Sequence, residues 1–200
     1  MTTYTEIKGQ NIQEVSSDPS PLIPGQIWYN STSNTLKAAV QEAGPAAWTA
    51  GGALITQKRC GSGSGASNTA ALAFGGSPGG ACTESYNGST WTAGGAMGTA
   101  RHLLAGAGTN TAALAFGGNN PNAACTESYN GSSWTAGGAL GTARYGLAGA
   151  GTNTAALAFG GYSVVPPTAY ANVTCTESYN GSSWTAGGAM AGAARQKLAG

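Results

Sequence analysis

The sequence predicts an all-β protein made of four-stranded repeats. The block from Thr83 to Met97 returns almost letter for letter at Thr126 to Leu140 and again at Thr176 to Met190. Each copy contains an Asn-Gly pair, which favours a tight hairpin because both residues tolerate positive φ. Glycine, at 34 of 200 residues, disfavours helices. Aromatic residues recur at fixed places, which indicates a packed structure rather than a solvated linker.

Tryptophan marks the period of the repeat. Trp48, Trp91, Trp134 and Trp184 are separated by 43, 43 and 50 residues, and a weaker copy of the block surrounds Trp48. The seven extra residues of the last interval fall between Gly161 and Cys175, so we expect them in one extended loop.

Four short strands are expected in each repeat. In the central copy they are His102–Gly108, Thr111–Phe116, Cys125–Tyr129 and a fourth that begins at Ser133. Four strands in 43 to 50 residues are typical of a propeller blade. Residues 45–200 therefore form the repeat region, with about three complete blades and a partial one.

Residues 1–44 show no repeat and are expected to form a separate segment. Thr3–Ile7 and Asn11–Val15 alternate like short strands, and the prolines of Asp18–Gly25 indicate an extended link. Gln26–Asn30 and Thr35–Val40 flank a polar four-residue loop and predict a β-hairpin.

This segment is too small to bury a robust core of its own. Its apolar and aromatic side chains are therefore expected to be exposed and to attach the chain to another protein. The candidate anchor residues are Tyr4, Ile7, Ile27, Trp28 and Tyr29.

Composition argues against several classes of function. A net charge of +1 gives no electrostatic attraction to nucleic acid. No apolar run is long enough to insert into a membrane, and the amino terminus does not resemble a signal peptide. The cysteines, Cys60, Cys82, Cys125 and Cys175, are expected to be buried free thiols.

The repeated charged residues are interpreted as structural. They are Arg59, Glu84, Arg101, Glu127, Arg144, Glu177 and Arg195. We expect each Glu to pair with an Arg of its own or the next blade. His102 is the only histidine, and its slot holds Cys60, Tyr145 and Gln196 elsewhere, so neither a catalytic triad nor a metal site is expected. No enzyme activity and no cofactor are predicted.

The recurring Tyr and Trp are expected to pack between neighbouring blades, with a sugar-stacking face as the alternative. Contact with a partner is assigned to the loops that differ between copies. The candidate contact residues in these loops are Ser77, Pro78, Asn119, Asn120, Tyr162 and Tyr170.

The repeat resembles the kelch repeat. Phe116-Gly117-Gly118, Tyr129, Trp134 and Arg144 match the double glycine, the Tyr and Trp pair and the basic residue of that motif, and the match recurs in the other copies over about 150 residues. The resemblance implies kelch-like blades of a partial or longer β-propeller. Either further blades follow or chains combine into a ring or spiral, and we expect a longer parent chain.

A second resemblance concerns the amino-terminal hairpin. Pro24 to Ser31, with Leu36 and Lys37, looks like a hairpin of tail fibres and other structural proteins of tailed bacteriophages, and the repeats behind it look like virion appendage proteins of cyanophage-like phages.

This resemblance implies a non-enzymatic virion protein, a fibre or appendage located in the virion and assembled in the host cytoplasm. Residues 1–44 would bind other virion proteins, and a homo-oligomer such as a trimer is expected. The repeats would contact a host-surface glycan or protein, or another virion protein. The alternatives are a lectin-like carbohydrate-binding propeller of a bacterium and, with less support, a propeller oxidase.

Overall fold

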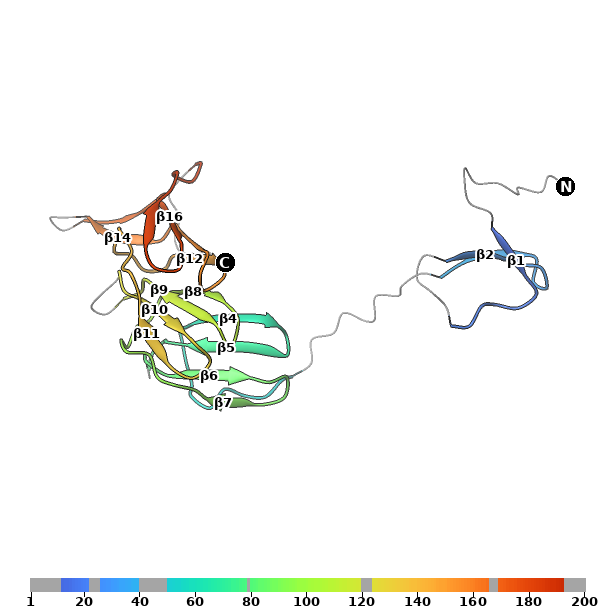
Figure 1. Ribbon diagram of the computed structural model, residues 1–200, viewed down its shortest axis with the longest axis horizontal. Helices are drawn as coiled ribbons and strands as arrows, with labels where there is room; N and C mark the ends of the chain where they lie inside the picture. Colours follow the sequence, from blue (N-terminus) through green and yellow to red (C-terminus); the bar gives the residue numbers. More distant parts are fainter. Residues whose placement is uncertain are drawn as a thin grey trace. The chain divides into compact units, whose positions relative to one another are not determined.

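The computed structural model describes residues 12–21, 26–39, 50–78, 80–119, 124–165 and 169–192. All regular structure in these residues is β-strand, which confirms the all-β prediction (Figure 1). The chain divides into two compact units, Met1–Thr49 and Ala50–Gly200. The boundary predicted between residues 44 and 45 lies outside the described residues.

The amino-terminal unit contains a three-stranded sheet. Its strands are β1 (Gln13–Val15), β2 (Ile27–Asn30) and β3 (Thr35–Ala38), in the order β1-β2-β3. β1 runs parallel to β2, and β2 and β3 form the predicted hairpin, whose loop ends at Asn34 with a φ of 54°. The strand predicted at residues 3–7 lies outside the described residues.

The larger unit contains three four-stranded antiparallel sheets, one for each repeat (Figure 1). The first sheet comprises β4 (Ser62–Ser67), β5 (Ala70–Phe74), β6 (Thr83–Tyr86) and β7 (Trp91–Ala93). The second comprises β8 (Ala105–Gly108), β9 (Ala113–Phe116), β10 (Thr126–Tyr129) and β11 (Trp134–Ala136). The third comprises β12 (Ala148–Gly151), β13 (Ala156–Phe159), β16 (Thr176–Tyr179) and β17 (Trp184–Ala186). The strands of each sheet lie side by side in the order in which they occur along the chain, with β14 and β15 outside the third sheet.

The extra residues of the third repeat form a hairpin rather than an irregular loop. β14 (Tyr162–Val165) and β15 (Ala169–Asn172) pair antiparallel outside the third sheet. The hairpin is inserted in the loop that connects β13 to β16 and does not enter the sheet. β13 and β16 therefore pair in the same register as β9 and β10.

Each Asn-Gly pair makes the turn between the third and fourth strand of its sheet. Asn130 Oδ1 accepts hydrogen bonds from the amides of Ser132 and Ser133 at 3.0 and 2.9 Å, and Gly131 has a φ of +96°. The side chain thus satisfies the turn amides while glycine takes the left-handed conformation. The same bonds recur at Asn87 and Asn180.

Glycine lets successive sheets approach closely. A Cβ on Gly106 of β8 would lie 2.6 Å from Phe74 Cζ and 2.8 Å from the Gly63 carbonyl oxygen of the first sheet. Any side chain here would hold the two sheets apart. The apolar core between the first two sheets comprises Leu72, Phe74, Met97, Leu104, Ala113, Ala115 and Tyr129.

Tryptophan fastens each sheet to the one before it. The Trp134 ring lies 5.1 Å from Phe74 in an edge-on arrangement and 4.9 Å from Tyr129, and its Nε1–H donates to Thr83 Oγ1 at 2.9 Å. Trp184 repeats this arrangement against the second sheet. The interpretation of Tyr and Trp as packing between repeats is confirmed for the pairs of the second and third sheets, whereas Trp91 of the first sheet contacts Tyr86 and donates to the Gly52 carbonyl.

Within the part of the chain that the structure describes, no further sheet covers the outer face of the third sheet. Leu157 of β13 is 41% exposed, whereas its counterparts Leu72 and Leu114 are 1% and 0% exposed. The described sheets do not form a closed ring.

Equivalent glycines after the fourth strand offer a test of this packing. A Cβ on Gly138 would clash with the Ser182 carbonyl oxygen of the third sheet, whereas a Cβ on Gly188 would meet nothing within 4 Å. We expect Gly138→Ala to lower the free energy of unfolding by about 1–3 kcal/mol. Gly188→Ala, the matched control, should leave it within about 0.5 kcal/mol of the wild type. Urea denaturation measures both values, and equal effects would contradict the packing.

Candidate functional site

The loops of each sheet gather at two ends that differ in kind. One end carries the Asn-Gly turns. The other end, which we call the long-loop end, carries the loops that follow β5, β9 and β13 together with the connections that lead into the next sheet. Charged side chains and sequence variation are concentrated at the long-loop end.

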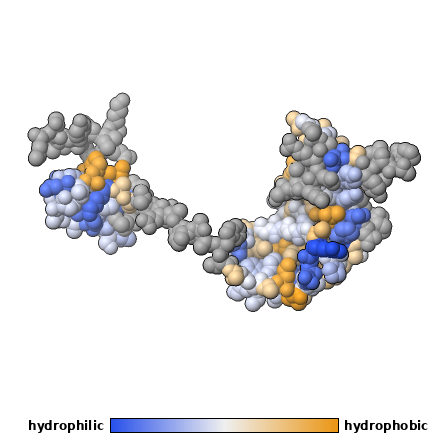
Figure 2. All heavy atoms as spheres, turned by 180° about the vertical axis from the view of Figure 1, so that it is seen from behind, coloured by the Kyte–Doolittle hydropathy of each residue, from blue (hydrophilic) through white to orange (hydrophobic). Residues whose placement is uncertain are grey.

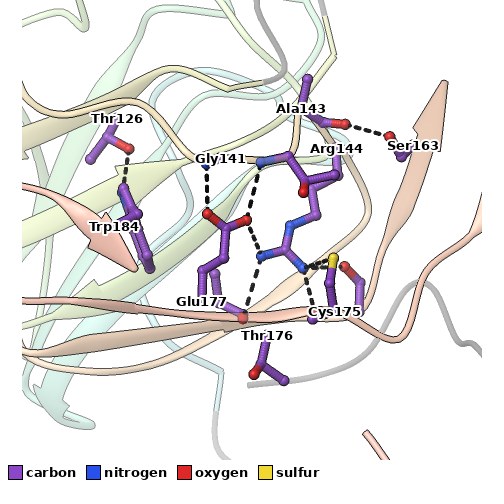
Figure 3. A network of polar contacts seen from close by, with 12 residues as sticks. Thr126, Gly141, Ala143, Arg144, Ser163, Cys175, Thr176, Glu177 and Trp184 are labelled. Carbon is purple, nitrogen blue, oxygen red and sulfur yellow. Dashed lines mark hydrogen bonds and ion pairs between the residues drawn. The ribbon is translucent and has the colours of Figure 1, made fainter. Parts of the chain in front are cut away.

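A buried ion pair ties each connection to its sheet. The side chain of Arg144 is fully buried, and its Nη2 lies 3.0 Å from Glu177 Oε1 (Figure 3). Arg144 Nη1 donates to the carbonyl oxygens of Gly160 and Cys175 at 3.0 and 2.8 Å. Glu177 also accepts the amide of Gly141 at 2.6 Å. We call such a pair, with the amides bound to its carboxylate, a joint.

The second sheet has the same joint. Arg101 Nη2 lies 2.8 Å from Glu127 Oε1, and Glu127 accepts the amide of Gly98 at 2.6 Å. Burial lowers the pKa of Arg101, although the charge of Glu127 opposes that shift. The pairing of Arg with Glu is confirmed for Arg101 and Arg144, while Arg195 lies outside the described residues.

The first sheet corrects one assignment, because Lys58 and not Arg59 pairs with Glu84, at 3.0 Å. Burial alone would raise the pKa of Glu84, but hydrogen bonds from Lys58 and from the amides of Ile55 and Thr56 outweigh it, and the net pKa is lowered. The Arg59 side chain stays exposed.

The register of the backbone explains this shift. Cys60, Leu103 and Gly146 all have positive φ, at 57°, 55° and 61°, so they occupy one slot. The amide of Leu103 donates to the Cys60 carbonyl, and the amide of Gly146 to that of Leu103. The counterpart of His102 is therefore Arg59 and not Cys60.

The candidate contact loops start from equivalent bridges at the long-loop end. Backbone bridges join Arg59 to Ser77, His102 to Asn119 and Tyr145 to Tyr162. The pairs thus share one backbone frame and differ completely in chemistry.

Ser77 and Tyr162 are half-buried, and Pro78 and Asn119 are exposed. Tyr170 lies on β15 opposite Val164, and Asn120 lies outside the described residues. The loop residues could be selected from the sequence, but Arg59, His102 and Tyr145, to which they are bridged, were not. The 43-residue period is a signal for them, because Arg59 lies 43 residues before His102 and Tyr145 lies 43 residues after it.

A groove that the sequence did not predict opens beside the second joint. Its volume is about 620 Å³. It is lined by Gly98, Thr99, Ala124, Cys125, Thr126, Glu127, Trp134, Ala136, Gly137, Ala139 and Ala143. One indole beside several polar groups suits a small polar ligand with an apolar face.

The amino-terminal unit corrects the predicted anchor. Trp28 is only 3% exposed, and its Nε1–H donates to Asp18 Oδ1 at 3.0 Å, so it is a core residue of this unit. Ile27 is 48% exposed, and Leu36, which was not predicted, is 58% exposed. Tyr29 is half-buried. Tyr4 and Ile7 lie outside the described residues.

The cysteines are free, as predicted, but they are not buried. Cys60 is exposed, and Cys82, Cys125 and Cys175 are half-buried. Among the described residues no group of three or more His, Cys, Asp or Glu side chains could hold a metal ion.

Comparison with known proteins adds no family. No family model matches the chain, and no curated protein is significantly similar to it. Within the described residues there is also no helix long and apolar enough to cross a membrane.

Removing one member of a joint should destabilise the larger unit strongly. Arg101→Met leaves the Glu127 carboxylate buried without its cation, so we expect a loss of about 3–5 kcal/mol in the free energy of unfolding. Arg101→Met combined with Glu127→Leu should lose less. The control, Arg59→Met, replaces an exposed arginine that belongs to no joint. It should change the free energy of unfolding by no more than about 0.5 kcal/mol. If chemical denaturation finds Arg101→Met as stable as Arg59→Met, the joint has no such role.

Acid should loosen the amino-terminal unit through Asp18. Hydrogen bonds from Lys37, Asn30 and Trp28 lower the pKa of Asp18 from 3.8 to about 2. A depressed pKa in the folded state contributes stability above pH 3.8 that is lost as the pH falls toward 2. The indole N–H resonance of Trp28 should therefore shift in this window. Asp18→Asn should abolish that titration, and its persistence in the variant would assign it to another group.

Proposed function

We propose that this chain is a non-enzymatic structural component of a tailed-bacteriophage virion. In this proposal the amino-terminal unit binds another virion protein, and the three sheets are kelch-like blades whose long-loop end contacts a host surface or a neighbouring virion protein. The observation that carries the proposal is a repeated, rigid frame that displays a different pair of side chains at each repeat.

That display is the arrangement expected of a contact surface. An exposed arginine beside serine, a histidine beside asparagine and two tyrosines packed edge to face occur at equivalent backbone bridges. The rings of Tyr145 and Tyr162 are 5.5 Å apart. The joints below these pairs hardly change, so the surface varies while the frame is kept.

The face of the β2–β3 hairpin supports a docking role for the amino-terminal unit. Tyr29 pairs with Leu36, and Ile27 with Ala38, so these four side chains share one face. Ile27 and Leu36 are about half exposed, and Figure 2 shows apolar surface on this unit. An apolar face on so small a unit favours coverage by another protein.

One observation favours a second function, that of a lectin-like carbohydrate-binding protein. The groove beside the second joint is lined by the indole of Trp134 and by Thr99, while Thr126 and Glu127, which also line it, are 2% and 4% exposed and already hydrogen-bonded. Sugars stack on aromatic faces and hydrogen-bond to such polar groups. The phage proposal is preferred because it also accounts for the exposed face of the amino-terminal unit.

The test is incorporation into particles of the phage that encodes the chain. Leu36→Asp should lower the amount of chain per purified particle about ten-fold, because a charge on the docking face costs ~1.4 kcal/mol or more. Thr135→Asp, an exposed position on β11, should have no effect. Quantitative mass spectrometry of particles gives the ratio to the major capsid protein. Absence of the wild-type chain from particles, with binding to a glycan array, would replace this proposal by the lectin-like one.

A further inference from the structure

The uncovered face of the third sheet is half of an interface that the chain makes twice elsewhere. We call it the far face; it includes Leu157, Phe159, Thr176 and Gly188. In the first and second sheets the equivalent Leu, Phe and Thr are at most 2% exposed, whereas Leu157 is 41% exposed and Phe159 and Thr176 are half-buried. The far face is therefore already formed, but the described residues supply only part of the cover that such a face has in the first two sheets.

The two complete interfaces show what fits such a face. In the first of them, Trp134 of the following sheet packs on Phe74 and donates to Thr83 Oγ1, at 5.1 and 2.9 Å. The Ser132 carbonyl oxygen of the following sheet lies so close to Gly95 that a Cβ at position 95 would clash with it. On the far face, Thr176 Oγ1 instead donates to the Gly188 carbonyl at 2.6 Å, and Gly188 has no neighbour at its Cβ position.

The first sheet carries most of the complementary half, although Gly61 stands where Leu104 packs on the preceding sheet in the first complete interface. Trp91 occupies the place of Trp134 and stacks on Tyr86 at 5.0 Å, as Trp134 does on Tyr129. β4 holds Gly63, the counterpart of Gly106, and a Cβ at Gly63 would meet no atom of another sheet.

Among the described residues, the outer edge of that half is covered by residues 50–56, which we call the cap segment. The cap segment reproduces the turn that follows a fourth strand. The Ser89 carbonyl oxygen lies against Gly52, just as the Ser132 carbonyl oxygen lies against Gly95. The amides of Ile55 and Thr56 donate hydrogen bonds to the Glu84 carboxylate. Leu54, whose counterparts Met97 and Leu140 are each 4% exposed, is 38% exposed.

We propose that the first sheet of a second copy of this chain docks on the far face of the third sheet, head to tail. Residues 186–192 of one copy then take the place of the cap segment of the other. Gly188 would seat the second copy's Ser89 carbonyl, and Trp91 of that copy would donate to Thr176. The occupant is another copy because this chain carries the far face and, apart from the leucine replaced by Gly61, the surface that covers such a face twice within it.

The exchange keeps the glycine turn, because the cap segment Ala50-Gly51-Gly52-Ala53-Leu54-Ile55-Thr56 is replaced by Ala186-Gly187-Gly188-Ala189-Met190-Ala191-Gly192, which begins with the same four residues. The driving force is the apolar surface of Leu157 and Phe159 that becomes buried. Since the two faces differ, the contact is heterologous and builds a ring or a spiral rather than a closed dimer.

Two equivalent glycines should respond in opposite directions. Gly188→Ala places a methyl group where the incoming Ser89 carbonyl must sit, so the dissociation constant measured by sedimentation velocity on the full chain should rise about ten-fold or more. Gly52→Ala weakens the cap segment in the same way and should lower it. Gly188→Ala should leave the thermal midpoint of the separate chain unchanged, which distinguishes lost association from misfolding.

A photo-crosslinking residue at position 157 locates the contact. With a mixture of isotopically light and heavy chains, crosslinks between copies should reach β4 or Trp91. The same residue at position 135 is the control and should give no crosslink to that surface. A wild-type chain that remains a monomer at high concentration would overturn the proposal. Crosslinks from position 157 that stay within one copy or reach other surfaces, or a Gly188→Ala variant that associates like wild type, would also do so.

Discussion

The buried carboxylate at each joint is the constraint on which the array depends. Glu127 lies on a strand, yet it accepts an amide from the preceding connection and pairs with Arg101, which also belongs to that connection. An ionised carboxylate without these partners would be very costly in so apolar a site. Each joint therefore fixes the path of the connection from one sheet into the next. The position of that path brings the inner glycines and the tryptophan of one sheet against the sheet before it.

Much of the fold follows from the sequence because the repeat records it. Asn130-Gly131 indicates the turn, the four strands per period indicate the sheet, and the recurring Tyr129 and Trp134 indicate the packing between repeats. The position of the extra hairpin could also be predicted, since seven added residues fall between Gly161 and Cys175. Its strands could not, because the link Val164-Val165-Pro166-Pro167 resembles a loop.

The failures have specific physical reasons. Arg59 was paired with Glu84 because arginine is the residue in the other copies, while the backbone register places Lys58 at that slot. Trp28 was expected at the surface because the amino-terminal segment is short, but three donors to Asp18 and the parallel pairing of β1 enclose it. The groove could not be foreseen because it is lined largely by small residues, which carry no chemical signal in a sequence.

The near identity of the joints has a consequence for how such a chain changes over generations. Each sheet presents the same contacts to the one before it and to the one after it, so inserting or removing a whole repeat leaves every remaining junction satisfied. Related proteins should therefore differ in the number of repeats more readily than in the residues of a joint. The length of the array would then vary with the number of repeats.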